Sequence, residues 1–168
     1  IEDGSYFPGI GYFRYMNMDL DYQLAGSGII SLWNKAYYQN QVYFPLYIYP
    51  LGSVGAFGDG SYVSVENDNG AYLANIYYRL AGNLKNPFAM WELNQIAAKS
   101  KNNQPTERGV LTAYFDLDGV TASSPENLPK SKYFKDTGFA GLHSDLTDEN
   151  RISLFFRSSP YGTYGHAD

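Results

Sequence analysis

The sequence predicts an α+β fold in which helices come first and antiparallel strands follow. Through most of the first hundred residues, apolar positions recur every three or four residues, which is the spacing of one helix face. Near the end of the chain, two short apolar segments flank a turn-forming loop, which is typical of a β-hairpin. Composition shifts between these parts. We therefore expect a helical part over residues 1–108, a linker over 109–131 and a strand-rich part over 132–168.

Two helices are expected in the first forty residues. The first has apolar residues at steps of three or four over 10–24 and ends at Gly26. The second begins after Ser31, a good capping residue, and continues through Tyr37. In the aromatic run over 43–50 the helical period is poor, and Pro45 predicts a kink or break.

Two further helices are expected before residue 101. The earlier one has Asn67 or Asp68 as its cap and ends at Gly82. The later one opens at Asn86 and Pro87, with proline in its first turn. Paired helices of this kind indicate a bundle, solenoid or toroid. Their inward-facing residues are Leu73, Ile76, Tyr77 and Leu80, then Met90, Leu93, Ile96 and Ala97.

Strands are expected at about 138–144 and 151–158, with 145–150 as the hairpin loop. Residues 110–115 alternate only weakly, and 123–129 are expected to be a linker. So few strands cannot close a sheet alone, which implies missing sequence or a partner. The chain begins with Ile1, and we expect it to be a piece of something longer.

Composition narrows the class of partner. The chain has 17 Tyr, 10 Phe and 2 Trp among 168 residues, and tyrosine offers a flat apolar face with a hydrogen-bonding tip, a surface that suits sugars. A net charge of −5 argues against nucleic acid. The basic run Lys130, Lys132 and Lys135 either attracts a polyanion or belongs to a solvated linker. No apolar run is long enough to span a membrane. Without cysteine there is no disulfide or thiolate metal site.

The two ends of the chain carry the residues suited to chemistry. Tyr12 and Tyr15 lie three apart and can point into one cleft, with Arg14 between them in sequence. The last dozen residues leave an apolar strand through a Ser/Pro/Gly turn that carries Tyr164 and His166. The chain has one other histidine, His143. Tyrosine can act as base and then acid if a nearby positive group or donor stabilises its phenolate, and Arg14 and His166 are the candidates.

Both ends resemble one enzyme family. The segment Glu2-Asp-Gly-Ser-Tyr-Phe-Pro-Gly-Ile-Gly-Tyr-Phe-Arg-Tyr15 resembles the DG-x-x-x-E-G-P-x-Y-x-x-Y pattern of heparinase II/III-like polysaccharide lyases, which include alginate lyases. Residues 134–144 and 155–168 resemble the start of that family's sheet domain. The order and separation of the segments also fit. The resemblance implies the last helical hairpins of an α/α toroid followed by the first strands of an antiparallel β-sandwich.

The resemblance also implies an activity and a set of site residues. The chain is expected to belong to a lyase that cleaves a uronate-containing polysaccharide by β-elimination. Alginate is the expected substrate, and Tyr12 or Tyr15 is the expected catalytic tyrosine. The family's H-x-H-x-D motif corresponds by letters to Tyr164-Gly-His166-Ala-Asp168. That match puts His166 at a structural metal position, with zinc as the metal, and Tyr164 in place of the substrate histidine. A two-residue deletion would instead make His166 catalytic.

Part of the family pattern is absent. The upstream Asn-His pair that grips the uronate carboxylate has no counterpart here, which implies that the rest of the same enzyme supplies it. No organic cofactor is expected, and the enzyme is expected to be secreted or periplasmic. Two other classes remain open: a non-catalytic carbohydrate-binding module, which also uses exposed aromatics, and a uronyl C5-epimerase, which shares proton abstraction at C5.

Overall fold

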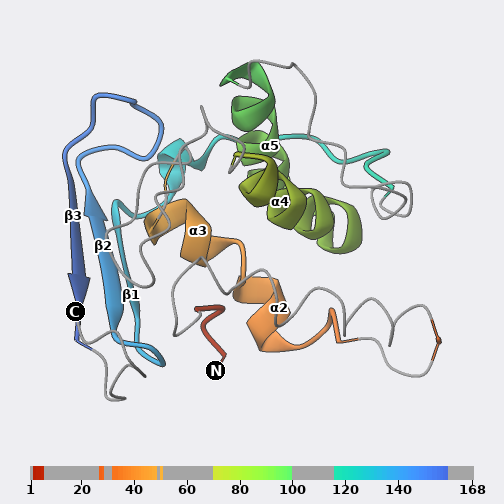
Figure 1. The fold of residues 1–168 in the computed structure, drawn as a ribbon, viewed down its shortest axis with the longest axis horizontal. Helices are drawn as coiled ribbons and strands as arrows, with labels where there is room; N and C mark the ends of the chain where they lie inside the picture. Colours follow the sequence, from red (N-terminus) through yellow and green to blue (C-terminus); the bar gives the residue numbers. More distant parts are fainter. Residues whose placement is uncertain are drawn as a thin grey trace.

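Helices precede a small antiparallel sheet in this chain, as the sequence predicts (Figure 1). The computed structural model describes residues 2–5, 27–28, 32–48, 50, 70–99 and 116–158. The sheet stands at one side, α3 lies against it, and α4 and α5 lie beyond α3 (Figure 1). The described elements are α2 (Ala36–Asn40), α3 (Tyr43–Ile48), α4 (Gly70–Leu84), α5 (Pro87–Lys99), a 3-10 turn (Pro125–Asn127), β1 (Ser131–Phe134), β2 (Phe139–His143) and β3 (Ser153–Arg157).

The first described helices correct two expectations. Trp33 lies in a turn, and α2 begins only at Ala36, with Lys35 rather than Ser31 at its cap position. Pro45 does not break the aromatic run, because it is the third residue of α3. Amides in the first turn of a helix have no intrahelical acceptor, so proline there removes no hydrogen bond. The helix predicted over 10–24 lies outside the described residues.

The helices α4 and α5 pack against each other and follow the predicted pattern closely. Asn86 caps α5, since its Oδ1 accepts from the amides of Phe88 and Ala89, both at 3.0 Å. The expected stop at Gly82 is wrong, because α4 continues to Leu84 and ends at Lys85, whose φ is 50°. The side chain of Lys85 holds that end by donating to the Asp116 carbonyl at 2.8 Å.

The expected inward faces of these helices are largely confirmed. Ile76, Tyr77, Leu80, Leu93 and Ile96 are buried. Met90 and Ala97 are half-buried, and the side chain of Leu73 lies outside the described part of the structure.

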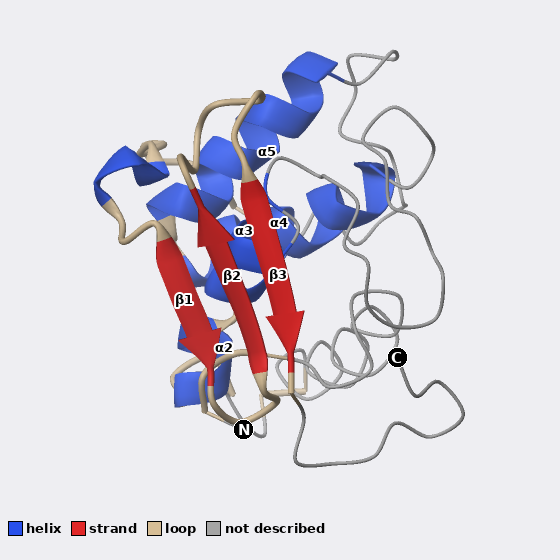
Figure 2. Ribbon diagram, turned by 90° about the vertical axis from the view of Figure 1, so that its left-hand side faces the viewer, coloured by secondary structure: helices blue, strands red, loops and turns tan. Residues whose placement is uncertain are grey.

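The sheet has the strand order β1-β2-β3, and both pairs are antiparallel (Figure 2). The two predicted strands and their hairpin loop are confirmed as β2, β3 and residues 144–152 between them. The sequence did not predict β1, because its four residues include a lysine and only Phe134 among them is buried. Its first residue was assigned to the linker.

Aromatic side chains join the sheet to α3. The ring of Phe44 makes edge contacts with Phe134 and Phe139, with centroids 5.2 and 5.4 Å apart. At Gly141 the strand comes so close to α3 that an added Cβ would lie 2.5 Å from the carbonyl oxygen of Tyr47. Glycine at this position therefore allows β2 to reach the helix. Residues of α3, α4, α5 and the sheet contribute to one hydrophobic core.

Candidate functional site

The residues selected for chemistry lie outside the described part of the chain. They are Tyr12, Arg14, Tyr15, Tyr164 and His166. We predict that Tyr12 and Tyr15 face Tyr164 and His166 across one cleft, because a tyrosine base needs a stabilising group within hydrogen-bond reach. The structure does describe residues that flank them, namely 2–5 on one side and Ser158 on the other, and these flanking residues define the candidate site.

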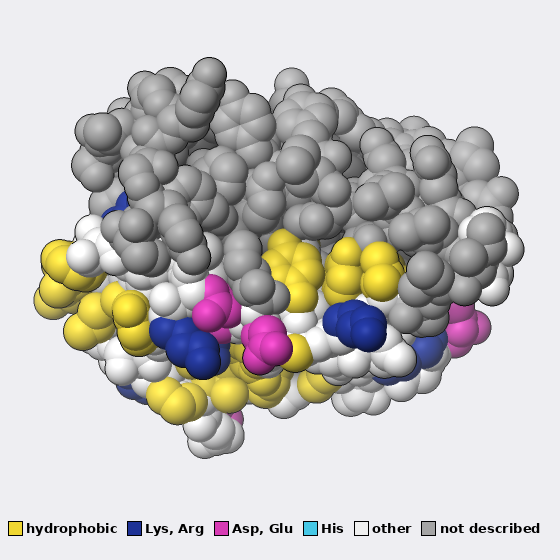
Figure 3. All heavy atoms as spheres, turned by 90° about the horizontal axis from the view of Figure 1, so that it is seen from below, with side chains coloured by type: hydrophobic (Ala, Val, Ile, Leu, Met, Phe, Trp, Pro, Cys, Tyr) yellow, Lys and Arg dark blue, Asp and Glu magenta, His cyan; other side chains and the backbone are white. Residues whose placement is uncertain are grey.

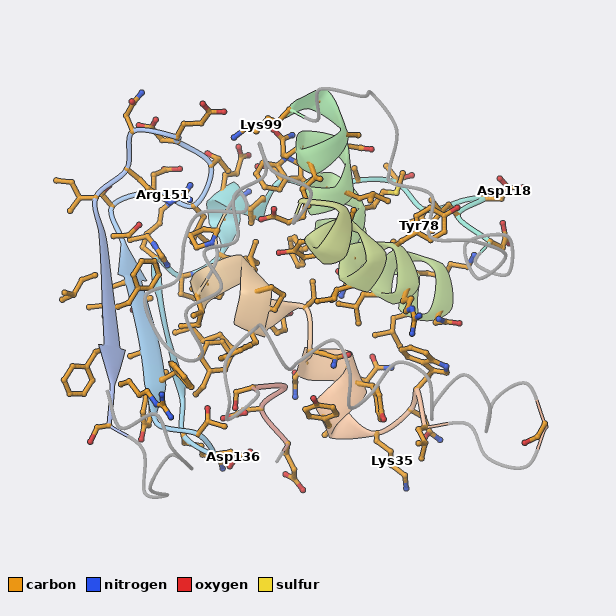
Figure 4. All side chains as sticks on the ribbon, viewed as in Figure 1. Lys35, Tyr78, Lys99, Asp118, Asp136 and Arg151 are labelled. Carbon is orange, nitrogen blue, oxygen red and sulfur yellow. The ribbon has the colours of Figure 1, made fainter. Side chains whose placement is uncertain are left out.

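One turn between β1 and β2 holds both flanking segments. The carboxylate of Asp136 in this turn accepts from the amides of Glu2 and Asp3, at 2.6 and 3.1 Å. In return, the amide of Asp136 donates to the carboxylate of Asp3 at 2.9 Å. Two residues further on, the carbonyl of Gly138 accepts from the amide of Ser158 at 2.8 Å. Figure 4 shows Asp136 at the end of the sheet beside the first residues of the chain.

The electrostatics of this turn favour the ionised form of Asp136. Hydrogen bonds from the amides of Glu2 and then Asp3 lower the pKa of Asp136 below its ordinary value. The carboxylate of Asp3 accepts from the amide of Ser5 at 3.0 Å and also from its hydroxyl. Seen from below, acidic and basic side chains lie next to one another on this end of the molecule (Figure 3).

Glycine makes the first turn possible. Gly4 has φ of 78°, a conformation that side chains disfavour, and an added Cβ would lie 2.3 Å from the backbone of Asn40. The side-chain amide of Asn40 donates to the carbonyl of Glu2 at 2.8 Å. Residues 2–5 are thus fixed between α2 and the sheet.

This site was missed by sequence reasoning, although part of its signal was visible. Asp3-Gly4 and Asp136-Thr-Gly138 both have turn-forming composition, so each turn could have been predicted. Their pairing could not, because the two aspartates are 133 residues apart. The clasp formed by Asp3 and Asp136 holds the segment that leads to Tyr12, and the Gly138 carbonyl holds Ser158, which leads to His166.

The described histidine has a structural role. His143 is 6% exposed, with Nε2 at 2.8 Å from the Tyr47 carbonyl and Nδ1 at 2.8 Å from the Ser153 hydroxyl. A carbonyl can only accept, so Nε2 carries the proton and Nδ1 accepts from Ser153. Burial lowers the pKa of His143 despite the hydrogen bond to Tyr47. Both nitrogens are in use, and neither is open to a metal or substrate.

Two buried tyrosines are also unsuited to proton transfer. Burial raises the pKa of Tyr47 to about 12, and its hydroxyl donates to the Pro129 carbonyl at 2.7 Å. Burial, followed by the nearby charge of Glu92, raises the pKa of Tyr77 well above its ordinary value. A phenolate at either position is disfavoured, so these residues are structural.

The lysine run is part of the folded structure. Lys130 pairs with Asp145 at 3.1 Å. Lys132 belongs to β1, and its Nζ lies 4.6 Å from the centroid of the Tyr43 ring. Lys132 therefore belongs to the sheet and not to a linker, whereas Lys130 lies in the loop before β1 and Lys135 is exposed.

Within the described residues no group of three or more His, Cys, Asp or Glu side chains is placed to hold a metal ion. The predicted zinc position at His166 lies outside these residues. No helix of the described part has the length and apolar character to cross a bilayer.

Comparison with protein-family models and with curated proteins gave no match for this chain. The resemblance to heparinase II/III-like lyases therefore rests on the sequence motifs alone.

Proposed function

We propose that this chain carries part of the active site of a polysaccharide lyase that cleaves a uronate-containing polymer by β-elimination, with alginate as the proposed substrate. One observation carries the proposal. The turn around Asp136 binds both Glu2–Asp3 and, through Gly138, Ser158. These are described parts of the three segments that resemble the lyase family. A shared anchor for three motif segments is what one active site between a helical part and a sheet requires.

The segments that run from the Asp136 turn to Tyr12 and to His166 are short enough for these two residues to lie in one cleft. Tyr12 is seven residues beyond Ser5, and His166 is eight beyond Ser158. An extended residue spans about 3.3–3.6 Å, so the two segments reach at most roughly 25 and 29 Å. Both groups can therefore lie in one cleft without any rearrangement of the described core.

The chemistry assigns a role to each group. A uronate carboxylate must be neutralised, the C5 proton needs a base, and the departing O4 needs an acid. We assign base and acid to Tyr12 or Tyr15, stabilisation of the phenolate to Arg14 or His166, and substrate contact to Tyr164. The proposed structural zinc would use His166 instead, together with ligands outside the described residues.

The finer fold also belongs to this proposal. Helical hairpins followed by an antiparallel sheet support the end of an α/α toroid joined to the start of a β-sandwich. The sheet is covered by α3 on one face, and its other face carries exposed apolar side chains. A second sheet packed on that face would complete a sandwich. We expect a secreted or periplasmic enzyme.

The proposal is tested with protein expressed from the complete open reading frame that encodes this chain. A lyase creates a C4–C5 double bond, so near-ultraviolet absorbance should rise with alginate, heparan, chondroitin or ulvan. Replacing the catalytic tyrosine, Tyr12→Phe or Tyr15→Phe, should lower kcat by orders of magnitude without unfolding. Tyr133→Phe is the matched control, because Tyr133 lies outside the three motif segments and its side chain points away from α3.

Two results would contradict the lyase, and a third would contradict the assigned base. Binding of the polymers without any rise in absorbance, unchanged by either tyrosine substitution, would indicate a carbohydrate-binding module. Conversion of one uronate epimer to the other without a double bond, followed by NMR, would indicate a C5-epimerase. Full lyase activity in both Tyr12→Phe and Tyr15→Phe would reject the assigned base.

A further inference from the structure

The half-buried lysines of the described structure differ in what surrounds their ammonium groups. Lys99 and Lys130 pair with carboxylates at 2.8 and 3.1 Å. Lys132 is half-buried too, but in the described part of the chain its Nζ lies over two aromatic rings instead of a carboxylate. The Nζ is 4.6 Å from the ring centroid of Tyr43 and 5.7 Å from that of Phe134. A ring face attracts the charge but supplies no oxygen acceptor, so the three N–H donors of this ammonium can serve a ligand.

Two aromatic side chains lie next to this ammonium. Tyr43 is the first residue of α3, and Phe88 lies in the first turn of α5. Their ring centroids are 6.5 Å apart, and the ring planes are tilted by 48°. Both residues are half-buried, so each keeps some surface in contact with solvent. We call Tyr43, Phe88 and Lys132 the aromatic–lysine patch.

The patch lies at an edge of the described sheet. Lys132 belongs to β1, which is paired on one side only, with β2 (Figure 2). The same strand leads into the turn that anchors the segments toward Tyr12 and His166. Lys132 precedes Asp136 in that turn by four residues, so the two are at most about 14 Å apart. A polymer bound near this turn can therefore extend to the patch.

We propose that the aromatic–lysine patch binds one uronate residue of the polymer, with Lys132 on its carboxylate and the rings of Tyr43 and Phe88 against the apolar face of the sugar. The inference rests on the proposed function, because it gives the same polymer a contact outside the reacting sugar. Ammonium and carboxylate form a charge-assisted hydrogen bond, and the rings offer flat apolar surface. A neutral sugar would leave the ammonium unmatched, and a small inorganic anion would make no use of the rings.

Calorimetric titration of the purified 168-residue chain with an alginate tetrasaccharide tests the site directly. Lys132→Met keeps an apolar stem against the rings but removes the charge, so Kd should rise about tenfold. The difference should shrink when NaCl is raised from about 0.05 to about 0.5 M. Lys132→Arg keeps the charge and should bind within about twofold of the wild type.

Two controls accompany this titration. Lys35→Met removes the same charge at an exposed position before α2 and should leave Kd unchanged. Cellotetraose, an uncharged tetrasaccharide, should bind the wild-type chain at least tenfold more weakly than the alginate tetrasaccharide, by about the factor that Lys132→Met loses. The comparison of the two sugars requires no substitution, so it holds even where a variant fails to fold. Circular dichroism shows whether each variant has folded.

Kinetics of the complete protein then separate binding from chemistry. The patch contacts a sugar that is not cleaved, so its interactions are the same in the ground state and the transition state. Lys132→Met should therefore raise KM by about the same tenfold and leave kcat unchanged. A fall in kcat with KM unchanged would contradict a binding role for Lys132.

The outcomes distinguish this site from the lyase. Alginate tetrasaccharide that does not bind the wild-type chain at about 10 mM overturns the site. Equal binding to Lys132→Met, or equally tight binding of cellotetraose, also overturns it. An active lyase whose KM is unchanged in Lys132→Met rejects only this site. Tetrasaccharide binding that depends on Lys132, in a complete protein without lyase activity, rejects only the proposed function.

Discussion

Replacing His143 by leucine should weaken the junction between the sheet and α3. The substitution removes the donor to the Tyr47 carbonyl and the acceptor for the Ser153 hydroxyl, both now at 2.8 Å. Leucine fills much of the space of the imidazole. The carbonyl of Tyr47 therefore stays buried beside Gly141 but has lost its partner.

The expected loss follows from these contacts. A buried polar group without its partner costs about 1–3 kcal/mol, and the half-buried Ser153 hydroxyl adds less. Burial of the leucine side chain offsets about 1 kcal/mol. The net loss should be about 2 kcal/mol, which lowers Tm by about 4–8 °C in a chain of this size.

His143→Gln is the matched control. Its terminal amide reaches about as far as Nε2 and can donate to the Tyr47 carbonyl, so it should recover roughly half of the loss. Urea unfolding followed by circular dichroism measures both variants. The midpoint should fall while the slope stays unchanged. If His143→Leu is as stable as the wild type, or less disruptive than His143→Gln, the assigned hydrogen bonds do not support the junction.

Wild type and His143→Gln together test how stability depends on pH. Burial lowers the pKa of His143 in the folded protein, and its unfolded value is about 6.5. The folded state then binds fewer protons, so this contribution is complete above about pH 6.5 and is lost as pH falls through the folded pKa. His143→Gln cannot titrate. The stability difference between wild type and this variant should therefore shrink on acidification, and a constant difference would contradict the lowered pKa.

Three further substitutions follow from the described contacts. Tyr77→Phe removes a buried hydroxyl with no hydrogen-bond partner among the described residues, so it should raise stability by up to about 1 kcal/mol in thermal unfolding, and a loss would show that the hydroxyl is bonded. Gly141→Ala should cost about 2 kcal/mol, measured by urea unfolding, because its Cβ would meet the Tyr47 carbonyl; unchanged stability would mean that α3 can move away. Asp136→Ala should speed amide exchange at residues 2–3 but not in α5. Because the pKa of Asp136 is lowered, its contribution is complete above about pH 4 and is lost as pH falls through the folded pKa. Acidifying the wild type should therefore lower the protection of the amides of residues 2–3 relative to their intrinsic exchange rates.

Local signals were enough for α4, α5, β2 and β3. Asn86-Pro87 predicted the start of α5, and the apolar segments on either side of residues 145–150 predicted β2 and β3. The errors arose where a tertiary contact overrode a local rule, or where a local rule was applied at the wrong position in a helix. Gly82 permits a helix end but does not require one, and α4 continues to the point where Lys85 binds Asp116. Pro45 is disruptive inside a helix but not in the first turn.

Local rules of this kind could not predict the hydrogen bonds between Asp3 and Asp136 or those of His143. Sequence reasoning recognised that the chain has few histidines but could not assign Tyr47 as the partner of His143, 96 residues away. Nor could it pair Asp3 with Asp136. Hydrogen bonds between distant segments depend on the packed core, and no local pattern encodes them.

The contacts of α3 with later residues have a consequence for synthesis of the chain. This six-residue helix is too short to be stable alone, and its partners Pro129 and His143 follow Tyr47 by 82 and 96 residues. At about 5–20 residues per second, a ribosome takes on the order of 5–20 s to produce them. During that interval the ring of Phe44 has no Phe134 or Phe139 to pack against. The segment 43–48 is therefore where a nascent-chain chaperone should bind, and its release should coincide with the arrival of β2.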